Sequence, residues 1–179
     1  MDHILLGLLL LKSRTIYELH DRIQKGLSMM YSSSMGSIQA AVRKLLASGC
    51  IEYSEETGNG RRKKLYSITE KGKQEFFDWV DTPLDAQNVR LPNLTKLYFM
   101  GFSTRETREQ RLLDYVEELK KQYEALDLIC REGETMEVPP EGREIFDYQL
   151  LTARYGRDMM QFNILWYQKL ISEMRCEEK

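Results

Sequence analysis

The segment Gly58-Asn-Gly-Arg-Arg-Lys-Lys-Leu-Tyr-Ser-Ile-Thr-Glu-Lys-Gly72 places four consecutive cations, Arg61 to Lys64, beside a glycine-containing turn. Four like charges in a row repel one another and cannot be buried without partners. The run therefore requires either bulk water or an anionic partner. The 179-residue chain has a formal net charge of -2, yet residues 1–80 carry twelve Lys and Arg against nine Asp and Glu. The N-terminal part is thus the candidate for meeting a polyanion.

The residues on both sides of the cations alternate between apolar and polar types, which predicts two β-strands. Ile51 and Tyr53 would share one face of the first strand, and Tyr66 and Ile68 would share one face of the second. The glycines of the connection tolerate positive φ angles and favour a turn. The sequence therefore predicts a β-hairpin, with its cations at the tip or on the outgoing strand.

Three helices are predicted ahead of the hairpin. The first would begin at about Asp2, acting as its N-cap, and its leucines would cover nearly its whole circumference. Thr15 and Glu18 have the spacing of a capping box that opens the second helix. The third would cover residues 35–48 and end at Gly49, where a left-handed C-cap is expected.

The order of these elements is that of a winged helix-turn-helix. Three helices are followed by a hairpin with a basic tip and then by a helix that Thr69 caps. Pro83 and Pro92 lie in a segment that reads as a linker. The fold class expected is mainly α with a small β-hairpin, divided into a winged helix-turn-helix DNA-binding domain at 1–82, a linker at 83–92 and a helical dimerisation domain at 93–179.

Two long helices are predicted in the C-terminal part. A second capping box, Ser103 to Glu106, opens the first of them, and its apolar residues recur at alternating spacings of four and three, as in a heptad seam. An acidic loop at 132–140 separates it from a last helix with an aromatic-rich stripe. Because neither helix can bury its stripe alone, the two are expected to pack on each other, on a partner subunit, or on both. The residues predicted at a dimer interface are Leu112, Val116, Leu119, Tyr123, Leu126, Tyr155, Met159, Phe162, Trp166 and Leu170.

The third helix has the composition of a DNA-recognition helix. Its large apolar residues cluster on one side of a helical wheel, and the other side carries small or polar residues. Small residues let the helix backbone enter a major groove, where Gln39 would pair with adenine and Arg43 with guanine or a phosphate. The cations of the hairpin would neutralise phosphates, with counterion release supplying affinity. The predicted DNA contacts are Thr15, Tyr17, Ser32, Ser33, Ser34, Ser37, Gln39, Arg43, Lys44, Asn59, Arg61, Arg62, Lys63 and Lys64.

The run S34-M-G-S-I-Q-A-A-V-R-K-L-L-A-S-G-C-I-E52, followed by R61-R-K-K-L-Y-S-I-T-E-K-G72, resembles the PadR family of bacterial transcriptional regulators. That family characteristically reads Ser-x-Gly-Ser-Ile-Tyr ahead of Leu-x-x-Leu-x-x-x-Gly-Leu-Ile, and later Tyr-x-Leu-Thr-x-x-Gly. The match covers about residues 4–80, and the long helix, loop and helix that follow are similar to the dimerisation part of the longer members. Gln39 stands where the family usually has Tyr, and Ile16-Tyr17 stands where relatives often show Tyr-Gly-Tyr.

The resemblance implies a homodimeric repressor that binds a near-palindromic double-stranded operator, with half-site centres about one helical turn, roughly 34 Å, apart. Many relatives are released from DNA by a small aromatic or drug-like molecule near the dimer interface. The candidate effector pocket is the set Tyr155, Met159, Phe162 and Trp166. The other interpretation of this set is plain dimer core, because aromatic residues at helical spacing are first of all packing residues.

No catalytic motif, metal site or cofactor site is predicted, so the chain is not expected to be an enzyme. The three cysteines are far apart, without a C-x-x-C motif, and only two histidines accompany them. This favours reduced thiols in a cytoplasmic protein over a structural zinc. The longest apolar run, Ile4 to Leu11, is too short to span a bilayer and lacks the flanks of an export signal.

Three alternatives remain open at the level of sequence. A MarR-like regulator would share the winged helix, although such proteins usually place dimerising helices at both ends. A winged-helix module that binds protein in place of DNA would keep the fold and lose the salt dependence. A small enzyme with an unrecognised site in the C-terminal helices has no sequence feature in its favour.

Overall fold

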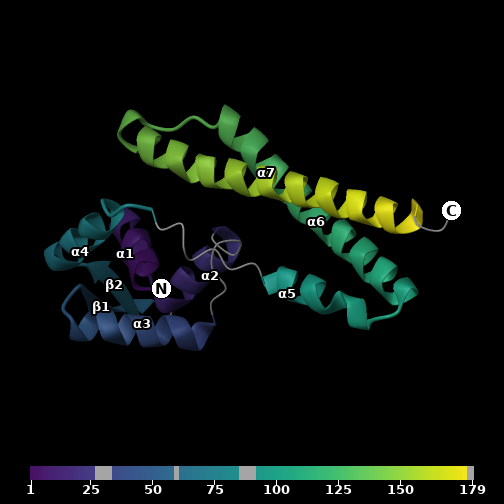
Figure 1. Cartoon of the computed structure of the whole chain (residues 1–179). Helices are drawn as coiled ribbons and strands as arrows, with labels where there is room; N and C mark the ends of the chain where they lie inside the picture. The colour runs from purple at the N-terminus through teal and green to yellow at the C-terminus, as the bar shows by residue number, and fades with distance from the viewer. Residues whose placement is uncertain (27–33, 59–60, 85–91, 177–179) are drawn as a thin grey trace. The chain divides into compact units, whose positions relative to one another are not determined.

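A computed structural model describes residues 1–26, 34–58, 61–84 and 92–176 of the chain (Figure 1). The chain forms two compact units, Met1–Asn88 and Val89–Lys179. The division between them falls inside the predicted 83–92 linker, most of which lies outside the described residues. The fold is mainly helical with one two-stranded hairpin, so the predicted fold class is confirmed.

In its described residues, the N-terminal unit has four helices and the hairpin around one apolar core. Three helices precede the hairpin, and one follows it, in the order expected for a winged helix. Leu19 and Ile23 of the second helix are fully buried, as their spacing predicted. The elements are α1 (Asp2–Leu11), α2 (Ile16–Gly26), α3 (Met35–Ala47), β1 (Ile51–Gly58), β2 (Arg61–Ile68) and α4 (Glu70–Val80).

Helix α1 differs from its prediction in two respects. Its N-cap is Met1, not Asp2, and no side chain caps it. Asp2 is instead the first helical residue, and its carboxylate accepts a hydrogen bond from the Lys44 ammonium at 2.6 Å. The helix is also not buried on all sides, as its ring of leucines suggested, because Leu11 is 46% exposed. One side of α1 therefore faces outward in the single chain.

Two glycines fix the junctions around the hairpin. Gly49 has a φ of 73°, which ends α3 with the left-handed residue that the sequence predicted. Gly72 lies in the first turn of α4, where a Cβ would collide with the backbone carbonyl of Cys50. Thr69 caps the same turn by accepting a hydrogen bond from the Gly72 N–H at 3.2 Å. Helix α4 can therefore approach the start of β1 only because residue 72 has no side chain.

The hairpin is longer than predicted, and its cations lie within a strand. Strands β1 and β2 pair antiparallel from Ile51 opposite Ile68 to Gly58 opposite Arg61. Arg61 to Lys64 are consequently residues of β2, which is the second of the two positions expected for them, on the outgoing strand. Arg14 adds an isolated bridge to Tyr66, through two backbone hydrogen bonds of 3.0 and 2.9 Å.

The described residues of the C-terminal unit form four helical segments. The N-cap of the first long helix differs from the prediction, because Thr104, not Ser103, accepts the hydrogen bond from the Thr107 N–H. The first long helix also continues to Thr135, so the predicted acidic loop at 132–140 is shorter than expected. The segments are α5 (Pro92–Phe99), the 3₁₀ helix η1 (Met100–Phe102), α6 (Arg105–Thr135) and α7 (Pro140–Cys176).

The predicted heptad seam of α6 packs on α7 of the same chain. Leu112, Val116 and Leu119 are at most 3% exposed and form a cluster with Tyr167 and Ile171. These side chains of the seam are therefore buried within the subunit, which is the first of the expected alternatives. The place of the seam in a dimer interface stays a prediction.

The opposite side of α7 carries a row of exposed apolar side chains, which we call the α7 apolar face. Tyr155 is 70% exposed, Phe162 60% and Trp166 42%. Large apolar surfaces of this kind on a soluble chain mark an interaction site. The face consists of Tyr148, Leu151, Tyr155, Phe162, Leu165 and Trp166.

Candidate nucleic-acid interface

Helix α3 divides into a buried and an exposed side. Ile38, Val42 and Leu45 are buried in the core of the N-terminal unit. The other side of the helix is exposed and carries small or polar residues, among them Gly36, Ser37, Gln39, Ala40, Arg43 and Lys44. The side chains on the exposed side are thus small, and a concave partner surface can come close to the helix backbone.

The amino end of α3 is held by a reciprocal serine cap. The Ser34 hydroxyl accepts a hydrogen bond from the Ser37 N–H at 3.2 Å, and the Ser37 hydroxyl accepts one from the Ser34 N–H at 3.1 Å. Ser37 Oγ also donates to the Ser34 carbonyl at 2.8 Å. Ser34 and Ser37, which were both predicted to contact DNA, therefore also form the cap that fixes where α3 begins.

The two cations of α3 have different surroundings. Lys44 is tied to Asp2 at 2.6 Å, and this hydrogen bond and the nearby negative charge raise the pKa of Lys44 above its ordinary value. Arg43 is exposed, with no ion pair to the carboxylates of the described residues. Arg43 is therefore the cation of α3 that can turn to a new anion without breaking an existing pair.

The strand register divides the cations of β2 between two faces. Side chains alternate along a strand, so Arg62 and Lys64 lie on one face and Lys63 on the other. Lys64 stands 4.0 Å from the centre of the Tyr53 ring, and contact with Tyr53 raises the pKa of Lys64. Arg62 lies 3.9 Å from the carboxylate of Glu55. The positively charged hairpin is thus partly neutralised from its own neighbouring strand.

The sequence analysis did not identify the acidic residues that lie opposite these cations. Glu55 pairs with Lys64, and Glu56 with Lys63, in the backbone register. The signal was present, since Asn59-Gly60 is a two-residue turn sequence that would set this register. The ion pair of Asp2 with Lys44 had no local sequence pattern that predicts it, because the two residues are 42 positions apart in the chain.

The remaining predicted DNA contacts fall into three groups. Thr15 is half-buried, and its hydroxyl donates to the Glu18 carboxylate at 2.9 Å within the confirmed capping box. Tyr17 is 78% exposed on the first turn of α2. The others lie outside the described part, and these are Ser32, Ser33, Asn59 and the side chain of Arg61.

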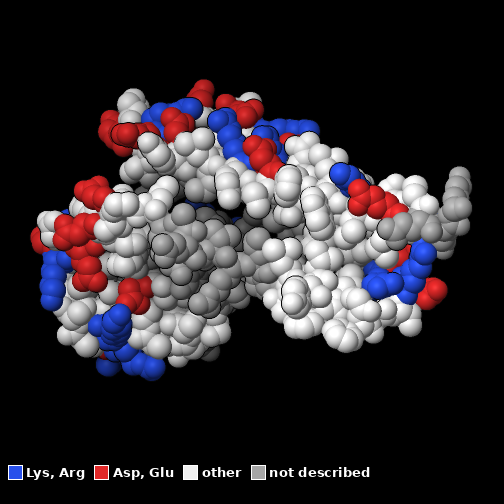
Figure 2. Space-filling view, viewed as in Figure 1, with Lys and Arg blue, Asp and Glu red and all other residues white. Residues whose placement is uncertain are grey.

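Charge is unevenly spread over the N-terminal unit. Figure 2 shows acidic side chains over α4, and basic side chains along the lower edge of the unit over α3. The exposed cations of α3, Arg43 and Lys44, lie on this basic edge, where they favour an approaching polyanion.

The α7 residues predicted for the dimer interface and the effector pocket lie on different sides of the helix. Tyr155, Phe162 and Trp166 belong to the α7 apolar face, whereas Leu170 packs with the cluster between α6 and α7. Met159 is half-buried on α7. A groove in the same unit lies elsewhere, between α5, η1 and α6, and none of the four predicted effector residues lines it.

The N-terminal unit, with its helix-turn-helix, its paired basic hairpin and its following helix, has the architecture of a winged helix. Residues 5–78 match the Transcriptional regulator PadR-like family. The match covers most of the N-terminal unit, and the family it names is one of transcriptional regulators. Across the described ranges, no helix combines the length and the apolar character needed to cross a membrane.

Similar proteins match this chain beyond its N-terminal unit. The Negative transcriptional regulator PadR of Bacillus subtilis is 26% identical over 131 residues, covering 72% of this chain and 70% of the relative. Its crystal structure in complex with operator DNA matches with a TM-score of 0.79 at 19% identity, covering 97% and 98% of the two chains. The same protein in complex with p-coumaric acid gives a TM-score of 0.74.

Another solved structure shows that this fold serves more than one regulatory outcome. The Vibrio cholerae virulence activator AphA matches with a TM-score of 0.74 at 20% identity, covering 98% of each chain. At such identities the likeness establishes the shared fold. The shared fold therefore serves repressors and activators alike.

Proposed function

We propose that this chain is a homodimeric repressor that binds a near-palindromic double-stranded DNA operator and that a small aromatic molecule releases it. The observation that carries the proposal is the exposed side of α3, which is small and polar and belongs to the same unit as the basic strand β2. In this arrangement α3 enters the major groove, and the hairpin lies along the phosphate backbone.

Gln39 and Arg43 are the residues that would recognise specific bases. An amide side chain forms two hydrogen bonds to adenine, and a guanidinium forms two to guanine, in the major groove. Both side chains are exposed on the same side of α3. The serine cap and the hairpin cations then set the position and affinity, and they carry little sequence information.

Dimerisation is assigned to the α7 apolar face. Tyr148, Tyr155 and Phe162 are spaced seven residues apart, which is the period of a helix packing along another helix. Burying one such aromatic side chain contributes about 1.5–3 kcal/mol, so a face of this size can hold two subunits together. A two-fold pair of subunits would present two copies of α3 to the two halves of an operator.

The DNA proposal is tested by fluorescence anisotropy of the full chain on duplexes that tile its own upstream region, beside a shuffled duplex. We expect one tile to bind tightly and in a salt-dependent manner. Gln39→Ala should alter the preference among duplexes more than the overall affinity, whereas Lys121→Ala, an exposed charge on α6, should leave both unchanged. Binding to the shuffled duplex that equals binding to every tile would favour a winged helix that binds protein.

The dimer proposal is tested by light scattering coupled to gel filtration. Phe162→Glu places a charge in the centre of the α7 apolar face and should yield monomers with weakened operator binding. Gln161→Glu introduces the same charge at the neighbouring exposed position and should stay dimeric. A dimer that survives Phe162→Glu would remove this face from the interface.

A further inference from the structure

Exposed aromatic side chains gather on α5 and η1. Phe102 is 92% exposed, Tyr98 82% and Phe99 55%. The ring centroids of Tyr98 and Phe99 are 4.9 Å apart, and those of Phe99 and Phe102 are 6.5 Å apart. A surface of this kind marks an interaction site, because apolar area in contact with water is unfavourable. We call Leu94, Tyr98, Phe99 and Phe102 the α5–η1 aromatic patch.

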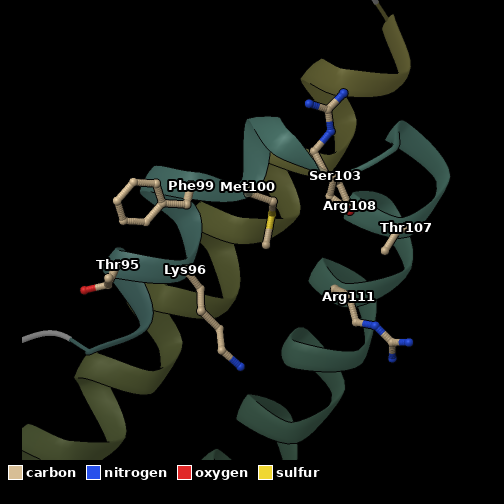
Figure 3. A pocket seen from close by; sticks show the side chains of 8 residues that line it. All are labelled: Thr95, Lys96, Phe99, Met100, Ser103, Thr107, Arg108 and Arg111. Carbon is tan, nitrogen blue, oxygen red and sulfur yellow. The ribbon is translucent and has the colours of Figure 1, made fainter.

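A groove with positively charged walls borders the patch, between α5, η1 and the first turns of α6 (Figure 3). Lys96, Arg108 and Arg111 line it, and no carboxylate does. Figure 3 shows the Phe99 ring at the side of α5, close to Lys96 in the same helix. Arg111 is paired with Asp114 at 2.9 Å, whereas within the described ranges no carboxylate pairs with Lys96. The complementary surface is therefore apolar and carries carboxylates.

The first turns of α7 have this composition. Ile145 is 51% exposed, Tyr148 66% and Leu151 49%, and their spacing of three residues puts them on one side of the helix. Glu141 and Glu144 precede Ile145 and Tyr148 by four residues each, so both carboxylates lie at the start of the same side. Both are exposed, and in the part of the chain that the structure describes no cation pairs with either. The start of α7 is thus an acidic and apolar strip.

Within one chain the strip and the patch lie at opposite ends of the pair of long helices. Glu109 at the start of α6 pairs with Arg175 at the end of α7, and Gly133 near the end of α6 lies against Leu150 near the start of α7. The two helices are therefore antiparallel, and the patch adjoins the start of α6. Helix α6 has 31 residues and is roughly 46 Å long. The start of α7 therefore cannot reach the patch of its own chain.

A second copy of the chain brings the two surfaces together. In the homodimer proposed above, α7 packs on α7 of the partner, and the acidic starts of the two helices are kept apart only when the helices are antiparallel. The α7 apolar face extends from Tyr148 to Trp166, so the partner's Glu144 comes about level with Leu170. Leu170 packs in the same cluster as Leu97 of α5 and Met100 of η1. The partner's strip therefore arrives at the end of the unit that carries the patch.

We propose that the α5–η1 aromatic patch and the cations beside it bind the acidic start of α7 from a second copy of this chain. The partner's Glu144 pairs with Lys96, and the partner's Ile145 packs on the aromatic rings. The groove is then completed by side chains of the partner. This inference rests on the proposed homodimer and adds to it a contact between two different surfaces, which fixes the antiparallel arrangement of the subunits.

The test measures the dimer dissociation constant of the full chain by sedimentation velocity, without DNA. Lys96→Glu and Glu144→Lys each place like charges at both copies of the contact, so each should raise the dissociation constant about tenfold. Phe102→Ala removes an exposed ring and should also raise it about tenfold. Lys121→Glu makes the same change of charge on α6 outside the patch and should leave it unchanged.

Mixing the two charge variants distinguishes a contact between copies from one within a chain. In a heterodimer of Lys96→Glu with Glu144→Lys, opposite charges face each other at both copies of the contact. We therefore expect native mass spectrometry of an equal mixture to show more heterodimer than random pairing gives. A monomeric wild type would overturn the homodimer and this contact together. A dimeric wild type whose dissociation constant is unchanged in the three patch and strip variants, or a mixture that pairs at random, would overturn this contact alone.

Discussion

Lys63 and Lys64 form a matched pair for testing how the hairpin meets DNA. They are adjacent and equally charged, and the register of β1 and β2 places them on opposite faces of the hairpin. Lys64 is held 4.0 Å from the centre of the Tyr53 ring. Its face also carries Glu55, whose carboxylate lies 3.9 Å from Arg62. We therefore expect Lys63 to contact a phosphate and Lys64 to support the hairpin.

The size of the effect follows from counterion release. Each lost phosphate contact changes the slope of log K against log salt by about 0.9. Between about 50 and about 300 mM salt, the affinity ratio of wild type to Lys63→Gln should therefore shrink about fivefold. Lys64→Gln should leave the slope nearly unchanged and should instead lower the midpoint of urea unfolding, because the Tyr53 contact is lost.

The assay is fluorescence anisotropy on one operator duplex and one shuffled duplex, across that salt range, beside urea unfolding of each variant. Lys63→Gln should weaken both duplexes by the same factor, since phosphate contacts carry no sequence information. Equal slope changes in the two variants would refute the reasoning from register. A larger slope change in Lys64→Gln than in Lys63→Gln would also refute it, because DNA would then contact the face of the hairpin that carries Tyr53 and Glu55.

Further predictions follow from single contacts. Gly72→Ala should destabilise the N-terminal unit by about 3 kcal/mol or more in urea unfolding, because a Cβ would meet the Cys50 carbonyl; Gly36→Ala, at an exposed position with room for a methyl group, should instead be neutral or stabilising by up to about 1 kcal/mol. Hydrogen bonds from Thr15 lower the pKa of Glu18 below its ordinary 4.5, so the stabilisation is present above pH 4.5 and is lost as pH falls through the lowered pKa. The stability difference between wild type and Glu18→Gln should therefore shrink below pH 4.5, and a difference that grows there would contradict the cap. Burial and the hydrogen bond to Glu75 raise the pKa of the Cys50 thiol, so alkylation at pH 8 should modify exposed Cys176 first, as peptide mass spectrometry would show.

The N-terminal unit was largely predictable because its signals are local. The Thr15 and Glu18 capping box, the left-handed Gly49 and the burial of Leu19 each depend on residues within a few positions of one another. Helical periodicity likewise separated the buried and exposed sides of α3. These interactions form in any chain with this spacing, so the sequence is enough to anticipate them.

The partners of the basic residues were less accessible to such reasoning. The Glu55 and Lys64 pairing required the length of the turn, and the Asp2 and Lys44 ion pair required the packing of α1 beside the end of α3. The groove between α5, η1 and α6 is a third example. Its walls come from segments whose approach is set by the packing of Leu97 and Met100 on the α6 and α7 cluster.

The sequence by itself determined the order of the elements, the polar side of α3 and the resemblance of the N-terminal unit to the PadR family. Only the tertiary structure decided which apolar stripe stays within the subunit. The seam of α6 and the stripe of α7 have similar heptad spacing, and composition does not say which surface meets which. In the folded unit, Leu112 and Val116 are buried against Tyr167, while Tyr155 and Phe162 point outward. The physical reason is that two helices bury one side of each other at a time, so the choice of side depends on their packing in three dimensions and not on either stripe alone.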